Sequence, residues 1–286
     1  MPQLATDRVV TVGELIQYGI QQLTDPTTAR LDCEILLCNI LKQPHYFLYA
    51  HSDVVVEQRD IVDFNSLISK RANGFPVAYL IGEKEFWSLR LQVNQHTLIP
   101  RPETELLVEQ ALALIENINN CKILDLGTGS GAIALAIARE RPDCSVTATD
   151  ISLPTLAMAQ QNAGLLGIRN VQFIHSDWYA SLTSQSFDLI VSNPPYVESG
   201  DSGFINGDIR YEPRVALDGG SFGLDAFRRI VPGANMYLKS GGKLLFEHGH
   251  AQGELIRELL HANRFIEILT RQDYAGLDRI TLAVLP

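Results

Sequence analysis

The chain has 286 residues, 46% of them hydrophobic, and a net charge of −10 with no block of lysine and arginine. The missing basic block argues against a protein that grips the phosphate backbone, although a local basic patch is compatible with an acidic total. No apolar run reaches the ~18–20 residues that a membrane span needs. The first residues, MPQLATDRVV, lack the basic and apolar segments of a signal peptide. The four cysteines form no CxxC pair, so reduced thiols in a cytoplasmic protein are expected.

Residues 1–73 show the pattern of a helical domain. Thr11-Val12-Gly13-Glu14 fits a capping box at the start of a helix. Apolar residues recur at helical spacing in residues 29–41 and 57–72. A small helical bundle without chemistry of its own is the predicted result.

Residues 74–100 differ from the helical segment and are predicted to link two domains. Residues 77–81 and 86–93 look like strands on either side of Gly82-Glu83-Lys84, which favours a β-hairpin. A proline near a helix start and acidic residues in its first turn follow. The second large domain is therefore predicted to span residues 101–286.

From residue 121 onward, predicted strands and helices alternate, which is typical of an α/β parallel sheet with helices on both faces. The last two strands are separated by only about nine residues, 271–279, which is short for a crossover helix. The final strand is therefore expected to run antiparallel. The predicted strands are residues 122–126, 145–149, 171–174, 189–192, 243–247, 265–270 and 280–285, and the predicted helices are 132–139, 154–166, 224–238 and 253–262.

A glycine turn, Gly127-Thr128-Gly129-Ser130-Gly131, follows the first of these strands. Its GxGxG spacing differs from the GxGxxG of dinucleotide sites, so pyrophosphate binding is less favoured. Asp150 ends the next strand and can accept hydrogen bonds from both hydroxyls of a ribose. Asp177 could reach an adenine amino group, and Trp178 could pack on the ring. The pattern predicts a cofactor of the adenosine type, and leaves NAD and S-adenosylmethionine open.

The stretch Asn193-Pro194-Pro195-Tyr196 comes directly after another buried strand. The two prolines fix the backbone where the strand ends. With a methyl sulfonium as donor, the Asn193 side-chain oxygen and the Pro194 carbonyl could each accept one N–H of a planar NH₂ group, while Tyr196 stacks on that group. Such placement needs no general base in the first step. The motif is therefore interpreted as a clamp for a planar NH₂.

Two further segments have less specific patterns. The long loop of residues 198–223 is expected to act as a lid on the substrate side. Glu247-His248-Gly249-His250 is expected to be a strand end with two surface histidines, because no clustered partners suggest a metal site.

Besides methyl transfer to a planar NH₂ group in a protein, three functions remain open at this point. An adenine-N6 methyltransferase acting on DNA or RNA would use the same clamp on a flipped base. A non-catalytic module could bind the cofactor or a partner for regulation. An NAD dehydrogenase is disfavoured by the glycine spacing.

The motifs together resemble class I S-adenosylmethionine-dependent methyltransferases that act on planar NH₂ groups. Over the whole chain the sequence resembles the peptide chain release factor glutamine methyltransferases, the PrmC/HemK family, although residues 1–73 match in layout only. NPPY is shared with DNA enzymes, whereas LIPRPETE is more specific. The matching stretches are FWSL (86–89), LIPRPETE (98–105), LDLGTGSG (124–131) with Asp150, SDW (176–178), NPPY (193–196), Glu212-Pro213 with Ala216-Leu217, and EHG (247–249).

The resemblance implies an N-terminal domain of five helices that recognises the substrate and a Rossmann-like sheet of seven strands. It implies transfer of a methyl group from S-adenosylmethionine to the glutamine N5 of the GGQ motif in class 1 release factors, which serve translation termination, and S-adenosyl-L-homocysteine as the product. Methylation of another protein's glutamine is an alternative. A monomer without metal, direct nucleic-acid contact or membrane contact is expected. By position, the cofactor residues are Gly127, Thr128, Gly129, Ser130, Gly131, Asp150, Asp177, Trp178 and Asn193, and the substrate residues are Asn193, Pro194, Pro195 and Tyr196, with Asn193, Pro194 and Tyr196 catalytic.

Overall fold

The computed structural model describes residues 9–183, 185–205 and 208–286. The chain forms two compact units, one ending at Gly82 and the other beginning at Glu83. This boundary falls inside the segment that the sequence assigns to the linker. The expectation about a signal peptide concerns residues 1–10, of which residues 1–8 lie outside the described residues, as do residues 206–207 of the predicted lid. No helix in the described part of the chain combines the length and the apolar character needed to cross a membrane.

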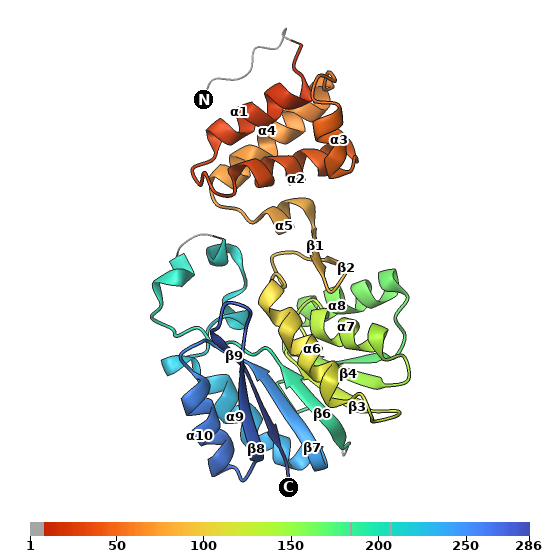
Figure 1. Ribbon diagram of the computed structural model, residues 1–286, viewed down its shortest axis with the longest axis vertical. Coiled ribbons are helices and arrows are strands. Elements are labelled where there is room, and N and C mark those ends of the chain that lie inside the picture. Colours follow the sequence, from red (N-terminus) through yellow and green to blue (C-terminus); the bar gives the residue numbers. More distant parts are fainter. Residues whose placement is uncertain (1–8, 184, 206–207) are drawn as a thin grey trace. The chain divides into compact units, whose positions relative to one another are not determined.

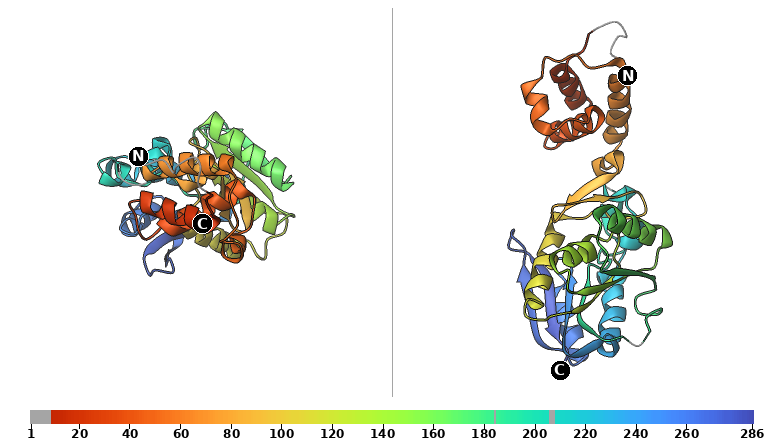
Figure 2. Two further views of the ribbon diagram at one scale, coloured as in Figure 1. Left: turned by 90° about the horizontal axis from the view of Figure 1, so that it is seen from above. Right: turned by 90° about the vertical axis from the view of Figure 1, so that its right-hand side faces the viewer.

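The N-terminal unit is a bundle of helices that pack around one apolar core (Figure 2). The predicted capping box starts the first helix: the Glu14 N–H donates to Thr11 Oγ1, and the Thr11 N–H donates to Glu14 Oε2 at 3.1 Å. Leu15, Leu36 and Phe64 are fully buried in this core. The described helices of the unit are α1 (Val12–Gln22), α2 (Ala29–Leu41), α3 (His45–Ala50), α4 (Gln58–Ala72) and α5 (Val77–Ile81).

The prediction of a strand at residues 77–81 was wrong, because this segment is helix α5. Pro76 precedes the helix in an extended conformation, and Gly82 ends it in the left-handed region at φ 80°. A short apolar run cannot be assigned from periodicity alone, and here its flanking proline and glycine are the two residues that favour a helix. Helix α3 was also missed, since six residues rich in aromatics give no clear helical period.

The hairpin exists but lies further along the chain than predicted. Strands β1 (Glu83–Phe86) and β2 (Leu89–Gln92) pair antiparallel. They are joined by Trp87 and Ser88, which have φ values of 51° and 56°. Two successive residues at positive φ match the right-handed twist of a two-residue hairpin.

The C-terminal unit is built on the predicted seven-stranded sheet, in the order β5-β4-β3-β6-β7-β9-β8 (Figure 1). As expected, the last strand runs antiparallel to both of its neighbours. The strands are β3 (Lys122–Leu126), β4 (Ser145–Asp150), β5 (Val171–His175), β6 (Phe187–Ser192), β7 (Leu238–Glu247), β8 (Ile266–Gln272) and β9 (Asp278–Val284).

Alternate residues of the sheet enter two separate apolar cores. Ile123 and Val191 face a core shared with α6, α7 and α8, whereas Leu124 and Ile190 face the core under α9 and α10. This is the period of two that a strand imposes on its side chains. The helices are α6 (Glu105–Leu114), α7 (Ala132–Glu140), α8 (Leu153–Leu166), α9 (Asp225–Tyr237) and α10 (Gly253–Ala262). Short 3-10 turns are η1 (Pro102–Thr104), η2 (Ser202–Ile205), η3 (Ile209–Tyr211), η4 (Arg214–Ala216) and η5 (Ser221–Gly223).

The order of the strands brings separate segments together at one edge of the sheet. Strand β3 pairs in parallel with β4 on one side and with β6 on the other. The residues that follow these three strands therefore leave the sheet side by side, at its carboxyl edge. In open α/β sheets this edge is where ligands bind.

Candidate active site

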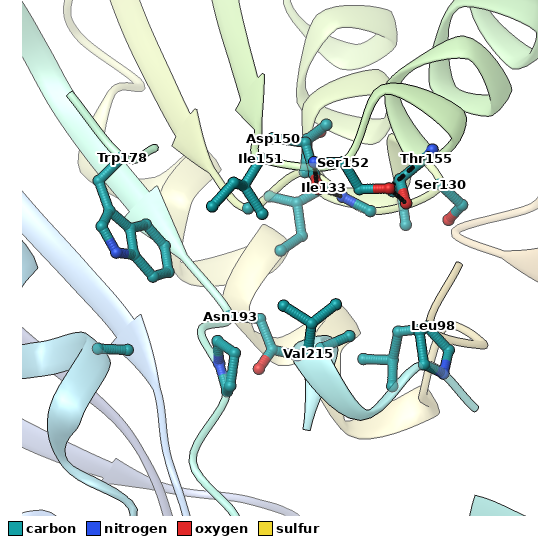
Figure 3. Close-up of a pocket in the computed structure, with 18 of the residues that line it drawn as sticks. Leu98, Ser130, Ile133, Asp150, Ile151, Ser152, Thr155, Trp178, Asn193 and Val215 are labelled. Atoms are coloured by element: carbon teal, nitrogen blue, oxygen red, sulfur yellow. Dashed lines mark hydrogen bonds between the residues drawn. The ribbon is translucent and has the colours of Figure 1, made fainter. Parts of the chain in front are cut away.

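A cavity of about 280 Å³ lies at the carboxyl edge of the sheet, within the C-terminal unit (Figure 3). Its walls come from the segments that follow β3, β4, β5 and β6, from residues 96–104 and from the long loop. In Figure 3 Asp150 and Ile151 lie on one side, with Asn193 and Val215 opposite. The labelled lining residues are Leu98, Ser130, Ile133, Asp150, Ile151, Ser152, Thr155, Trp178, Asn193 and Val215.

The glycine turn crosses from β3 to α7 beside β4. The N–H groups of Gly127 and Thr128 both donate to Thr149 O at 2.9 Å, which fixes the turn to the neighbouring strand. Gly127, Gly129 and Gly131 all have positive φ. Gly131 does not line the cavity: a Cβ there would lie 2.9 Å from Leu135 Cδ1, so this glycine serves the packing of α7.

The Asp150 carboxylate lies at the end of β4 and is held at both oxygens. Oδ2 accepts the Gly129 N–H at 3.0 Å, and Oδ1 accepts the Ser152 N–H at 2.9 Å. Burial raises the pKa of this carboxyl, while the hydrogen bonds from Ser152 and Gly129 act in the opposite direction. Each oxygen keeps lone-pair capacity for a ligand hydroxyl. Asp150 can therefore act as the ribose acceptor that the sequence predicts.

A second carboxyl group, Asp125, lies behind the turn and is fully buried. Thr128 Oγ1 donates to its Oδ2 at 2.7 Å, whereas Oδ1 has no hydrogen-bond partner in the described part of the chain. Burial raises the pKa of Asp125 to about 7. No role for Asp125 follows from the sequence pattern, because this residue lies within an apolar strand.

Trp178 lines the cavity and lies against the glycine turn. A Cβ on Gly127 would come 3.6 Å from its ring atom Cζ3, and Trp178 itself adopts φ 52°. Asp177 also lines the cavity, but its carboxylate already pairs with Arg229 at 2.6 Å. An adenine amino group would therefore meet an ion pair rather than a free carboxylate at Asp177.

Asn193 follows the last residue of β6 and lines the cavity on the side opposite Asp150 (Figure 3). Its Nδ2 donates to the hydroxyl of Thr104 at 3.2 Å. The amide nitrogen is thereby engaged with the protein, and the amide oxygen is left as the acceptor. This is the orientation that an acceptor for an incoming N–H requires.

The other residues of the NPPY motif differ in whether they face the cavity. Pro195 lines the cavity, whereas Pro194 and Tyr196 are absent from its described lining. The Tyr196 ring packs against the core under α9, and its hydroxyl donates to Glu247 Oε1 at 3.2 Å. In this structure Tyr196 therefore holds the motif from behind and does not face the cavity.

The segment before α6 supplies site residues that sequence reasoning named only as a resemblance. Leu98, Arg101 and Thr104 line the cavity. Arg101 pairs with the buried Glu212, whose Oε2 also accepts the Ile99 N–H at 3.0 Å. The pairing of LIPRPETE with a glutamate more than 100 residues away cannot be recognised from spacing.

The expectation of two surface histidines was half wrong. His250 is exposed, but His248 is fully buried. Its Nε2 lies 2.8 Å from Thr281 Oγ1 and its Nδ1 lies 2.9 Å from Gly249 O. Because both ring nitrogens have hydrogen-bond partners, the imidazole ring can be buried without losing hydrogen bonds. This burial lowers the pKa of His248. Among the described residues no group of histidine, cysteine and acidic side chains could hold a metal ion.

Comparison with known proteins agrees with this geometry. The family model "Methyltransferase small domain" matches residues 102–207, and "PrmC N-terminal domain" matches residues 14–82. A Thermus thermophilus 16S rRNA N2 G1207 methyltransferase, solved with S-adenosylmethionine and guanosine, superimposes with a TM-score of 0.52 at 21% identity, covering 71% of this chain and 50% of its own. Fold and site define a class I S-adenosylmethionine-dependent methyltransferase.

The relatives are more specific. The release factor glutamine methyltransferase of Xylella fastidiosa (strain 9a5c) is 46% identical over 257 residues, 90% of this chain and 94% of that protein, and the enzyme of Salmonella typhimurium is 45% identical over 269 residues, 93% and 96%. The chain belongs to the release factor glutamine methyltransferase family.

Proposed function

We propose that this protein transfers the methyl group of S-adenosylmethionine to the side-chain nitrogen of the glutamine in the GGQ motif of class 1 release factors. Family membership supports the reaction and the kind of substrate. The single observation that carries the proposal is the orientation of Asn193, whose nitrogen is engaged by Thr104 so that its oxygen is left for an N–H from the cavity. A carboxamide presents such an N–H.

The residues on the other side of the cavity fit the methyl donor. Gly127, Gly129 and Asp150 line this side of the cavity. The two glycines have no side chain, so their backbone is accessible to a ligand, and Asp150 adds a carboxylate. We infer that Asp150 accepts hydrogen bonds from the ribose hydroxyls of S-adenosylmethionine and that the glycine turn faces the amino-acid portion of the same molecule. When bound, S-adenosylmethionine supplies a methyl group activated by its sulfonium.

The chain's own contribution is placement. An amide nitrogen is a weak nucleophile because its lone pair is delocalised into the carbonyl. We infer that Asn193 Oδ1 accepts one of its N–H groups and that the Pro194 carbonyl accepts the other, which fixes the nitrogen toward the donor. Preorganised acceptors of this kind need no reorientation during the reaction. The nitrogen gains a bond to the methyl carbon while the bond between that carbon and the donor sulfur breaks, so that S-adenosyl-L-homocysteine leaves, and the nitrogen loses one proton to water.

The proposal is tested with a purified release factor and S-adenosylmethionine. A mass shift of about +14 Da, one methyl replacing one hydrogen, is expected on the peptide that contains GGQ. Fragmentation should place it on the glutamine. Nucleic acid is offered in a parallel reaction, and methyl transfer to nucleic acid alone would overturn the proposal.

The N-terminal unit is proposed to hold the body of the release factor, because it contributes no residue to the described lining of the cavity and exposes large apolar side chains. Leu31, Tyr46 and Tyr49 are 54%, 73% and 57% exposed. We propose further that the enzyme acts as a monomer in the cytoplasm, where its substrate works. Light scattering during gel filtration checks the first of these points.

A further inference from the structure

Asn193 is one end of a chain of polar contacts that continues behind the cavity. Its Nδ2 donates to Thr104 Oγ1 at 3.2 Å, and Thr104 is 4% exposed. The third residue of the group is Glu247, which ends β7 and is 1% exposed. The register between β6 and β7 pairs Ser192 with Phe246, so the next residues of the two strands are Asn193 and Glu247.

One hydroxyl group donates a hydrogen bond to the Glu247 carboxylate, and a second, that of Thr104, stabilises its charge. The Tyr196 hydroxyl donates to Oε1 at 3.2 Å. Burial raises the pKa of Glu247, while the Thr104 hydroxyl, the Arg279 guanidinium and the Tyr196 hydroxyl act in the opposite direction by stabilising its charge. Oε2 has no hydrogen-bond partner in the described part of the chain. A buried carboxylate oxygen calls for a donor, and the Thr104 hydroxyl is the neighbouring donor that acts on this group.

A threonine hydroxyl has one hydrogen to donate and two lone pairs to accept with. When its hydrogen is directed at a carboxylate, only the lone pairs remain for Asn193. The Asn193 amide must then present its NH₂ to Thr104, and its oxygen is directed the other way. The two ends of an asparagine amide have nearly the same shape, so its packing alone would not choose between them.

We infer that Thr104 and Glu247 are positioning residues that set which end of the Asn193 amide faces the substrate. This inference rests on the proposed function, because it concerns the acceptor for the substrate's N–H. If the amide were reversed, its NH₂ would meet the NH₂ of the substrate, and a hydrogen bond would be replaced by two opposed donors. The two residues therefore act on the rate through Asn193 and not by touching the reacting atoms.

Thr104→Val and Thr104→Ser test the inference as a pair. Valine keeps the shape and removes the hydroxyl, whereas serine keeps the hydroxyl. We expect kcat of the valine variant to fall by about tenfold or more, with the Kd for S-adenosylmethionine and the KM for substrate within about twofold of wild type. The serine variant should keep most of the activity. Thr147→Val, which removes a buried hydroxyl in β4 away from the cavity, serves as the matched control.

Glu247→Gln gives a second and independent test. A glutamine there can donate to Thr104, which frees the threonine hydrogen to point at Asn193 and favours the reversed amide. We expect a loss in kcat similar to that of Thr104→Val, and the double variant should be little worse than either single one, since the two act through one contact. Additive losses would overturn the inference.

The remaining outcomes are equally decisive. Wild-type kcat in Thr104→Val, or an equal loss in Thr104→Ser, would overturn the inference, because only volume would then matter. If the melting temperature shows that Thr104→Val does not fold, the Glu247→Gln and Thr104→Ser variants decide by the same criteria. All ratios are measured on whichever NH₂ substrate the wild type methylates, so failure on release factor alone refutes the proposed function and leaves the test of Asn193 orientation intact.

Discussion

The Arg101 guanidinium and the Glu212 carboxylate form an ion pair between the segment that precedes α6 and the long loop after β6. Glu212 is fully buried at its side chain, and its other oxygen accepts the Ile99 N–H. Pro213, Val215 and Ala216, which directly follow this glutamate, line the cavity. The pair therefore fixes one wall of the active site. The action of this loop as a lid stays a prediction.

Arg101→Ala should release that wall and destabilise the protein. Removal of the guanidinium leaves a buried carboxylate without its partner, which costs about 1–3 kcal/mol of the free energy of unfolding. Urea unfolding measures the loss, and limited proteolysis should show earlier cleavage between residues 198 and 223. Arg228→Ala, which breaks an exposed pair with Asp225, is the control and should cost less than about 1 kcal/mol. Equal stability in both variants would contradict the prediction.

Asp150→Ala should weaken the binding of S-adenosylmethionine. Loss of a charged acceptor for the ribose corresponds to a rise in Kd of about 10- to 100-fold. Calorimetric titration measures it. Asp143→Ala, which removes an acid before the other end of β4, should bind as the wild type does. An unchanged Kd in Asp150→Ala would show that the ribose lies elsewhere.

Asn193→Ala should separate binding from chemistry. Because we propose that the glycine turn and Asp150 hold most of the cofactor, its Kd should change little. The rate should fall by about 10²-fold or more, because one preorganised acceptor is lost. Single-turnover methylation measures the rate. Undiminished turnover would remove the clamp from the mechanism.

Asp125 predicts the pH dependence of stability. Its pKa is about 7 in the folded state and about 3.9 in an unfolded chain. Between these values the native state holds the proton that the unfolded state has lost. This one group therefore lowers the free energy of unfolding as pH rises from about 4 to 7, by up to about 1.4 kcal/mol per pH unit, with no further change above pH 7.

Asp125→Asn tests that sign. The variant has no titrating group at this position, so its unfolding free energy should fall less than that of the wild type between pH 5 and pH 7, by the slope given above. Urea unfolding at several pH values compares the two proteins. Parallel curves would show that Asp125 is ionised in the folded protein across this range.

Tyr46→Ala tests the proposed role of the N-terminal unit. The side chain is 73% exposed, so its loss should leave the melting temperature and the Kd for S-adenosylmethionine unchanged. The KM for release factor should rise about fivefold, which corresponds to about 1 kcal/mol. Tyr274→Ala, an exposed tyrosine of the C-terminal unit, is the control. A short peptide that contains GGQ should be methylated equally by both variants.

Local sequence patterns predicted much of the fold because their signals lie within a few residues of each other. Helix α2 follows from its apolar spacing, and the capping box at Thr11 follows from two residues three positions apart. The antiparallel last strand follows from the length of one connection. Helix α5 was mistaken for a strand because five apolar residues have no readable period, and the flanking Pro76 and Gly82 that favour a helix were not weighed.

Residues of the cavity could be predicted from the sequence where a short local motif marks them. The glycine turn, Asp150 and Asn193 were identified on this basis, and all three reach the cavity. The partners of these residues could not be found in the same way. Thr104 meets Asn193 across 89 positions, and the burial of His248 depends on Thr281 from another strand. Only the folded chain brings such pairs together.

The pairing of β3 with β6 also bears on how such an enzyme can diversify. The donor side of the cavity follows one of these strands and the acceptor side follows the other, so their separation is set by the spacing of a single ladder, about 4.8 Å between strands. The long loop and the N-terminal unit are not part of this strand pairing and do not affect the distance between the two strands. Evolution can therefore exchange the client protein by altering the loop and the N-terminal unit, while the reaction centre is inherited unchanged.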